Sequence, residues 1–281
     1  MASGSATMTF TSSTNSIVTN GAATTIVLSG SASSIESGPS NHPLEQTLTT
    51  NDGTLEVLSN RNFASTSAGI TNNGTIQLGG GALTAASLTN GSGSTLSGYG
   101  TFSPTGGTTI GNGVLVSPGP SASGNYVATM SFGTPLTFGQ GGAATFDIEN
   151  ASGAAGTGYD TINVTGALTV SATSGTPFTI NVESINPGTG LPGLATFNMA
   201  QSYTWTLASA GSVSGFNASD FTFNVGSFAN GTGGGVFSVT ASGTDIFVNF
   251  TPVPEPSTWA LVAAGAAMTA LALWRRPARV G

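Results

Sequence analysis

The 281-residue sequence contains no cysteine and no lysine, and its only cationic side chains are four arginines. Without cysteine, neither a disulfide framework nor a thiolate metal site or nucleophile is possible. The single histidine, His42, lies in a turn-forming stretch and excludes metal sites built from clustered histidines. Charged side chains make up 5% of the residues, against roughly 25% in an average domain. These absences argue against most classes of enzyme.

The few charges are strongly acidic in balance. The formal net charge is −7, and three of the four arginines lie in the last seven residues. Residues 1–252 carry ten carboxylates against Arg61 alone, a net charge of −9. Binding to nucleic acid by phosphate neutralisation needs several lysines or arginines on one face. We therefore expect no nucleic-acid partner, good solubility and weak adhesion to anionic surfaces.

An imperfect repeat of about 20 residues runs through residues 1–120, which we take as the first region of the chain. Each unit pairs an Asn-Gly type of turn with a short strand of alternating apolar residues, and units begin at Asn20, Asn51, Asn72, Asn90 and Asn112. Asparagine and glycine tolerate the positive φ of tight turns. A unit of this length is typical of one coil of a parallel β-helix, in which each coil buries its apolar face against its neighbours. The sequence predicts a right-handed β-helix over this region.

Residues 121–251 form a second region, rich in phenylalanine. Twelve of the 15 phenylalanines fall within residues 126–250. Apolar residues alternate with Thr, Asn and acidic residues here, which predicts strands with one buried face. The inward sets are Ala144, Phe146 and Ile148; Phe178, Ile180 and Val182; Tyr203, Trp205 and Leu207; Phe221, Phe223 and Val225; and Ile246, Val248 and Phe250. We expect an all-β region that continues the β-helix or caps it with a sheet; a separate β-sandwich is the alternative.

Three short motifs resemble the passenger repeats of autotransporter-type proteins. These motifs are Leu96-Ser97-Gly98-Tyr99-Gly100-Thr101-Phe102, Val116-Ser117-Pro118-Gly119, and Tyr159-Asp160-Thr161-Ile162-Asn163-Val164-Thr165-Gly166. The resemblance covers roughly residues 50–180. It implies a β-helical shape and carries no chemistry.

The C-terminal region, residues 252–281, contains an apolar run from Ser257 to Trp274. Eighteen residues at about 1.5 Å each give about 27 Å of helix, close to the ~30 Å hydrocarbon thickness of a bilayer. Indole rings prefer the membrane interface, and basic residues favour the cytoplasmic side. The residues with these preferences are Trp259 and Trp274 near the two ends of the run, followed by Arg275, Arg276 and Arg279. We predict a transmembrane helix over 257–274, a cytoplasmic tail over 275–281, and residues 1–252 on the opposite side of the inner membrane.

Directly before this run stand Val253, Pro254, Glu255 and Pro256. Two prolines keep such a segment extended and accessible to a processing enzyme. Together with the apolar run and the arginines, the segment resembles the PEP-CTERM sorting signal of exported bacterial proteins. The resemblance implies that an exosortase recognises Pro-Glu-Pro, removes the helix and tail, and transfers the body to the cell surface or matrix.

Proteins of this kind should begin with an export signal. The first residues show neither a basic n-region nor an apolar h-region. This indicates a start assigned too far downstream, or a sequence that lacks its first part.

The candidates for chemistry in the body are isolated acids. Asp147 and Glu149 share one strand face and could form an acid–base pair, although carboxylates on a strand more often solvate its polar face. Asp160, Asp220 and Asp245 stand outside any dense calcium-binding loop. We therefore assign no catalytic residue, metal or cofactor.

What remains is a long surface of hydroxyl and amide groups, which can form hydrogen bonds with glycans. Exposed tyrosines could add stacking on sugar rings, if Tyr99, Tyr126 or Tyr159 lies outside the core. We expect a non-enzymatic, exported structural protein of the cell surface or extracellular matrix, associated with extracellular polysaccharide. The alternative is a surface polysaccharide-degrading enzyme on a β-helix, which would use acids such as Asp147, Glu149 or Asp160 and would need two carboxylates ~5–9.5 Å apart in a groove.

Overall fold

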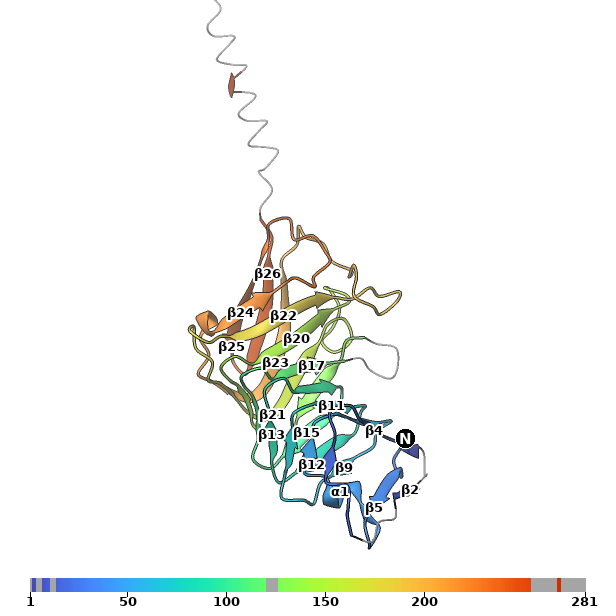
Figure 1. Cartoon of the computed structure of the whole chain (residues 1–281). Helices are drawn as coiled ribbons and strands as arrows, with labels where there is room; N and C mark the ends of the chain where they lie inside the picture. Colours follow the sequence, from blue (N-terminus) through green and yellow to red (C-terminus); the bar gives the residue numbers. More distant parts are fainter. Residues whose placement is uncertain (1, 4–6, 11–13, 120–125, 254–266, 269–281) are drawn as a thin grey trace, which may run out of the picture.

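The computed structural model describes residues 2–3, 7–10, 14–119, 126–253 and 267–268. The chain is mostly β, and successive coils stack along one axis from β4 near the N-terminal end to β24 and β26 at the other end (Figure 1). Most strand ladders are parallel, and those that are antiparallel lie at the two ends of the stack. The all-β prediction is confirmed, and the parallel sheets are consistent with the predicted β-helix.

Three sheets form the sides of the coils. Sheet 1 contains, in spatial order, β1 (Ala2–Ser3), β4 (Thr25–Ser29), β8 (Thr54–Leu58), β11 (Thr75–Leu78), β14 (Thr95–Gly98), β17 (Leu115–Pro118), β20 (Ala143–Ile148), β22 (Phe178–Ser184) and β24 (Phe221–Asn224). Sheet 2 contains β9 (Phe63–Ala64), β12 (Ala82–Ala85), β15 (Thr101–Pro104), β18 (Thr129–Phe132), β21 (Thr161–Val170), β23 (Tyr203–Ser214), β26 (Asp245–Thr251) and β25 (Val236–Ser242), with β16 (Thr108–Ile110) and β19 (Leu136–Phe138) attached through β21. Sheet 3 contains β3 (Thr19–Asn20), β7 (Thr50–Asn51), β10 (Ile70–Asn72) and β13 (Leu88–Asn90).

Smaller elements lie outside these three sheets. A three-stranded sheet near the N-terminus contains β2 (Thr7–Phe10), β5 (Ser34–Ser37) and β6 (His42–Pro43). A single helical turn follows as α1 (Leu44–Thr47), and a 3-10 turn, η1 (Ala218–Asp220), precedes β24.

The repeat produces these coils because equivalent residues lie in register. Leu55, Ile76, Leu96 and Val116 pair successively across β8, β11, β14 and β17, and each is fully buried. Full burial of an aliphatic side chain of this size contributes about 1.5–3 kcal/mol. Each coil therefore obtains its apolar contacts from the coils directly above and below it.

The repeated asparagines have a different role from the one that their Asn-Gly context predicts. Asn20, Asn51, Asn72 and Asn90 end the strands of sheet 3 in register. Their carboxamides form a chain of hydrogen bonds, here called the asparagine ladder: Nδ2 donates to the next Oδ1 at 2.6, 2.8 and 3.2 Å. Positive φ among the described non-glycine residues occurs elsewhere, at Asn41, Ser59 and Asn60. The ladder asparagines therefore do not use the tolerance of asparagine for positive φ.

The glycines after the ladder are required for space. A Cβ on Gly74 would lie 2.0 Å from the carbonyl oxygen of Gly53, and a Cβ on Gly53 would lie 2.3 Å from that of Gly21. Successive coils thus approach backbone to backbone at this corner, where only glycine fits.

In the second region the coils become flatter. β21 is ten residues long and pairs with β18 through Thr161–Val164 and with β19 through Leu168–Val170. One long strand thus replaces a corner of the earlier coils. The strands of the region continue the parallel sheets, which favours the continuing β-helix over a separate sandwich, and antiparallel β26 and β25 then complete sheet 2.

The predicted alternation in this region is largely confirmed. Ala144, Phe146 and Ile148, Phe178, Ile180 and Val182, and Ile246, Val248 and Phe250 are all fully buried. The core is held by aromatic contacts, such as Phe138 stacked on Phe178 with ring centroids 4.4 Å apart. Trp205 is also buried, and its Nε1 donates to the Ala151 carbonyl at 2.8 Å. Val225 is an error of the prediction, because it lies beyond the end of β24 and is exposed.

Candidate functional site

The predicted sorting segment begins directly after the last strand of the body. β26 lies between β23 and β25 and pairs with both, so the strand that leads into the segment is hydrogen-bonded along both of its edges. Its inward residues Ile246, Val248 and Phe250 are fully buried, and Val253 is exposed. The segment therefore starts from a firmly held strand and reaches the surface within a few residues.

Most predicted site residues of this segment lie outside the described residues. These are Pro254, Glu255, Pro256, Trp259, Trp274, Arg275, Arg276 and Arg279. Of the predicted transmembrane helix over 257–274, Ala267 and Met268 are described, and both are helical. In the part of the chain that the structure describes, no helix is long and apolar enough to cross a bilayer.

A carboxylate cluster lies near one end of sheet 1, formed by Asp147, Asp160 and Glu183. Asp147 on β20 faces Glu183 on β22 in register. Asp160 is fully buried, and its Oδ1 accepts from the Ala128 N–H at 2.7 Å while its Oδ2 accepts from the Asp147 N–H at 3.2 Å. The Asp160 N–H donates to the Asp147 carbonyl at 2.9 Å. Asp160 thus holds three chain segments together through main-chain bonds.

The cluster favours protonated carboxyl groups. Burial, and then repulsion by Glu183, raises the pKa of Asp147 to about 7. Burial, and then repulsion by Asp147, raises the pKa of Asp160 well above its ordinary range, although two backbone hydrogen bonds act in the opposite direction. Asp147 Oδ1 is buried without a hydrogen-bond partner among the described residues. A carboxyl group whose pKa is raised to about 7, beside a second carboxyl group, is an arrangement that general acid–base catalysis can use.

The sequence suggested a different set of acids. Glu149 follows the end of β20, and its raised pKa is caused by burial alone, so it is not coupled to Asp147. Glu183 was missed, although its outward place in the alternation of 178–183 was a usable signal. Asp245 accepts a hydrogen bond from Ser209 at 2.6 Å, in another part of the body.

Two further predictions concern metal sites and His42. Among the described residues, no group of three or more acidic or histidine side chains is arranged to hold a metal ion. His42 lies in β6, where it is exposed and its Nδ1 is 3.0 Å from Gln46 Oε1.

The tyrosines proposed for stacking on sugars are covered to different degrees. Tyr159 belongs to the core and lies against Phe146, with ring centroids 5.9 Å apart. Tyr126 is half-buried, and its ring packs on the backbone of Gly190. Tyr99 is half-buried as well. Stacking on sugars is therefore disfavoured for Tyr159 in particular.

Comparison with known proteins identifies one segment of the chain. No curated protein and no solved structure matches the chain. A family model described as the PEP-CTERM protein-sorting motif matches residues 252–276. The match begins directly after β26 and includes Val253, Pro254, Glu255 and Pro256. Residues 252–276 therefore carry a PEP-CTERM sorting motif, which implies an exported precursor and supports the interpretation of the chain as an exosortase substrate.

Proposed function

We propose that this protein is a structural component of a bacterial cell surface or extracellular matrix, presented there after exosortase removes its C-terminal segment. The observation that carries the proposal is the sorting motif at 252–276, attached to a β body whose last strand ends at Thr251. Cleavage within Val253–Pro256 would release the body without breaking any strand. In the precursor, residues 257–274 hold the chain in the inner membrane and the arginine tail stays in the cytoplasm.

The surface of the body supports association with polysaccharide. The outward residues of the coils are largely Thr, Ser and Asn, whose hydroxyls and amides can bind sugar hydroxyls at about 0.5–1.5 kcal/mol per hydrogen bond. Arg61 is the only cation in residues 1–252, and it forms an ion pair with Glu45. A body of this kind is suited to neutral glycans, and it would hold them through many weak contacts.

The experiment is intact-mass measurement of the protein from its native cells, separately in the inner-membrane, outer-surface and medium fractions. We expect a species that ends within Val253–Pro256 outside the inner membrane. Replacing Pro254-Glu255-Pro256 by Ala-Gln-Ala should leave the full-length chain in the inner membrane, whereas Pro252→Ala, at the first matched residue and outside Pro-Glu-Pro, should be processed normally. A full-length chain confined to the inner membrane in wild-type cells would overturn the proposal.

A surface polysaccharide-degrading enzyme is the second candidate, and the carboxylate cluster favours it. Asp147, with its pKa raised to about 7, would be the general acid, and Glu183 would be the second carboxyl group of the pair. The test is release of reducing ends from the native exopolysaccharide by the purified full chain. Activity that Asp147→Asn abolishes and Asp220→Asn preserves would establish the enzyme. If the wild-type chain and both variants released no reducing ends, the enzyme would be excluded and the structural role would remain.

A further inference from the structure

Sheet 3 stops at β13, although the coils continue beyond it. β13 pairs with β10 on one side, but the strand of the following coil, β16, pairs with β19 and not with β13. The end of sheet 3 at β13 coincides with a change in the next coil. β19 pairs with the long strand β21 of the flatter coils, and β16 pairs with β19. Two neighbouring strands therefore have edges that face each other without pairing.

The register identifies the main-chain groups on the β13 edge. Two hydrogen bonds between β10 and β13 show which residues of β13 bond to β10. They run from Ile70 N–H to the Ser87 carbonyl at 2.9 Å and from Gly91 N–H to the Asn72 carbonyl at 2.8 Å. In a parallel ladder, alternate residues of a strand bond to one neighbour. Thr89 thus bonds to β10, and the N–H and C=O groups of Leu88 and Asn90 point toward β16.

The same reasoning applies to the edge of β16. Its bonds to β19 run from Thr108 N–H to the Pro135 carbonyl at 2.9 Å and from Gly139 N–H to the Ile110 carbonyl at 2.8 Å. The N–H and C=O of Thr109 therefore point toward β13. Both edges present donors and acceptors to the space between them.

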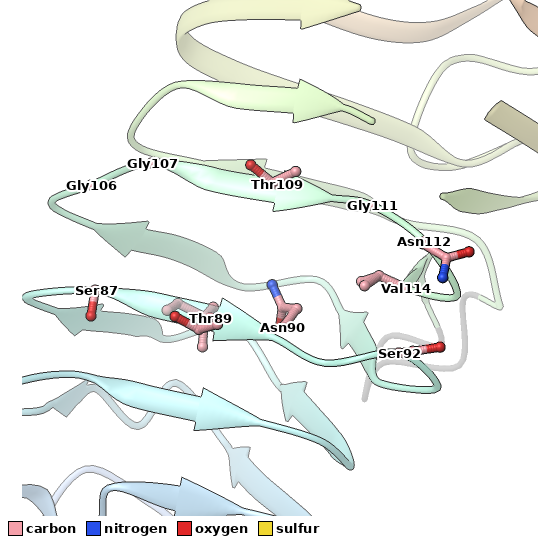
Figure 2. A pocket seen from close by; sticks show the side chains of 11 residues that line it. Ser87, Thr89, Asn90, Ser92, Gly106, Gly107, Thr109, Gly111, Asn112 and Val114 are labelled. Carbon is pink, nitrogen blue, oxygen red and sulfur yellow. The ribbon is translucent and has the colours of Figure 1, made fainter. Parts of the chain in front are cut away.

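The asparagine ladder ends at this space. Asn90 Oδ1 accepts from Asn72, but its own Nδ2 is buried and has no partner among the described residues. Figure 2 shows this amide nitrogen directed into the space between the strand of Thr89 and the strand of Thr109. An unbonded buried amide is costly unless a ligand or water satisfies it.

A cleft of about 620 Å³ occupies this position. Its polar side chains are four hydroxyls and two carboxamides: Ser87, Thr89, Ser92, Thr109, Asn90 and Asn112. No charged side chain lines it among the described residues, and Gly106 and Gly107 contribute no side chain to the lining. Ligand sites typically have volumes of roughly 300–1,000 Å³. The lining matches a small, neutral ligand that is rich in hydroxyl groups.

An added peptide strand fits less well. Residues of β13 and β16 have Cα atoms within 8 Å of each other. An inserted strand would hold its two neighbours about 9.5 Å apart, which is twice the usual strand spacing. The strands are thus too close for an inserted strand.

We propose that the cleft between β13 and β16 binds a neutral sugar unit of an extracellular polysaccharide, with Asn90 Nδ2 and the Thr109 main chain and hydroxyl as its principal contacts. The choice of ligand rests on the proposed function at the cell surface. The site would give the polysaccharide association a defined position on the body.

The experiment uses the full chain in a detergent without a sugar headgroup. Maltohexaose and cellohexaose are the neutral probes, hexagalacturonate is the anionic control, and hydrogen exchange reports the contact region. We expect both neutral probes to slow exchange at 87–93 and 106–114, and the anionic control to have no effect. Thr109→Val should weaken binding about two- to ten-fold, the value of one hydrogen bond. Thr71→Val changes the matching position on β10, a strand that pairs with both of its neighbours, and should bind the probes as the wild type does.

Several results would overturn the proposal. The first is that neither neutral probe binds, and the second is that Thr109→Val and Thr71→Val lose binding affinity equally. The third is that the probes slow amide exchange elsewhere on the body and not at the cleft. The fourth is that a synthetic peptide copying residues 86–92 binds more tightly than the probes. In the free protein, the Thr109 amide should exchange faster than that of Thr71, which donates to the Thr49 carbonyl at 2.8 Å. Equal exchange would mean that the strands are paired and the cleft is absent. Binding by purified protein does not depend on processing, so failure of the sorting experiment would be seen separately.

Discussion

Replacement of Asn51 by alanine tests whether the asparagine ladder stabilises the stack. Asn51 is fully buried and connects three coils. Its Oδ1 accepts from Asn20 at 2.6 Å, and its Nδ2 donates to Asn72 Oδ1 at 2.8 Å and to the Thr75 carbonyl at 3.0 Å. Asn51→Ala removes these three hydrogen bonds, and the buried polar atoms of the two neighbouring coils lose Asn51 as their partner.

The expected size of the effect follows from these three bonds. Each contributes roughly 1 kcal/mol net, so the variant should lose about 3 kcal/mol of unfolding free energy, before any contribution from the cavity. For a chain of this size that corresponds to a Tm about 6–12 °C lower. Asn73→Ala is the matched control. Asn73 is exposed, and among the described residues its side chain donates only to Asp52, so Asn73→Ala should lower the unfolding free energy by no more than about 0.5 kcal/mol.

The assay is urea unfolding of the full chain, followed by far-ultraviolet circular dichroism, together with amide hydrogen exchange. Because coils interact mainly with their neighbours, exchange in Asn51→Ala should accelerate most in β7, β10 and β3. Exchange in β22 and β26 should change least. If Asn51→Ala and Asn73→Ala were equally stable, the ladder would contribute nothing, and the argument from buried amides would fail.

Three further changes have definite expectations. The raised pKa of Asp147 means that the unfolded chain loses this proton first, so stability falls as pH rises from 3.8 to about 7. Asp147→Asn should reduce that fall without abolishing it, because the pKa of Asp160 is also raised; urea midpoints at pH 5 and 8 measure the difference. Phe138→Ala, which removes a buried ring stacked on Phe178, should cost about 3–5 kcal/mol in urea unfolding. Gly98→Ala should lower Tm far more than Gly93→Ala: both have positive φ, but a Cβ at 98 would lie 1.9 Å from a backbone oxygen, whereas at 93 nothing lies within 4 Å.

The features of the fold that could be predicted from sequence are those that repeat. A spacing of about 20 residues, with apolar residues at equivalent positions, places Leu55, Ile76 and Leu96 in one buried row, because a coil has no other surface against which to bury them. Alternation in 178–182 and 246–250 likewise fixed the inward face of each strand. Both signals depend on burial, which is the strongest determinant of the pattern.

The role of the ladder asparagines could not be predicted from local sequence. Asn-Gly is a strong turn signal, and a single unit cannot reveal that Asn72 has amides above and below it. The coupling of Asp147 to Asp160 and Glu183 was hidden for a related reason. It depends on which strands become neighbours, and the sequence separation of these residues does not indicate that.

The cleft lies where the asparagine ladder ends, and both positions depend on the change in coil shape at β21. The ladder continues only while the next coil supplies an amide in register, and Ile110 occupies the corresponding strand position on β16. Once the long strand β21 removes a corner of the coil, β16 follows β19 and the last amide, at Asn90, loses its neighbour. The asparagine ladder therefore ends in one buried amide nitrogen, Asn90 Nδ2, that has no partner among the described residues.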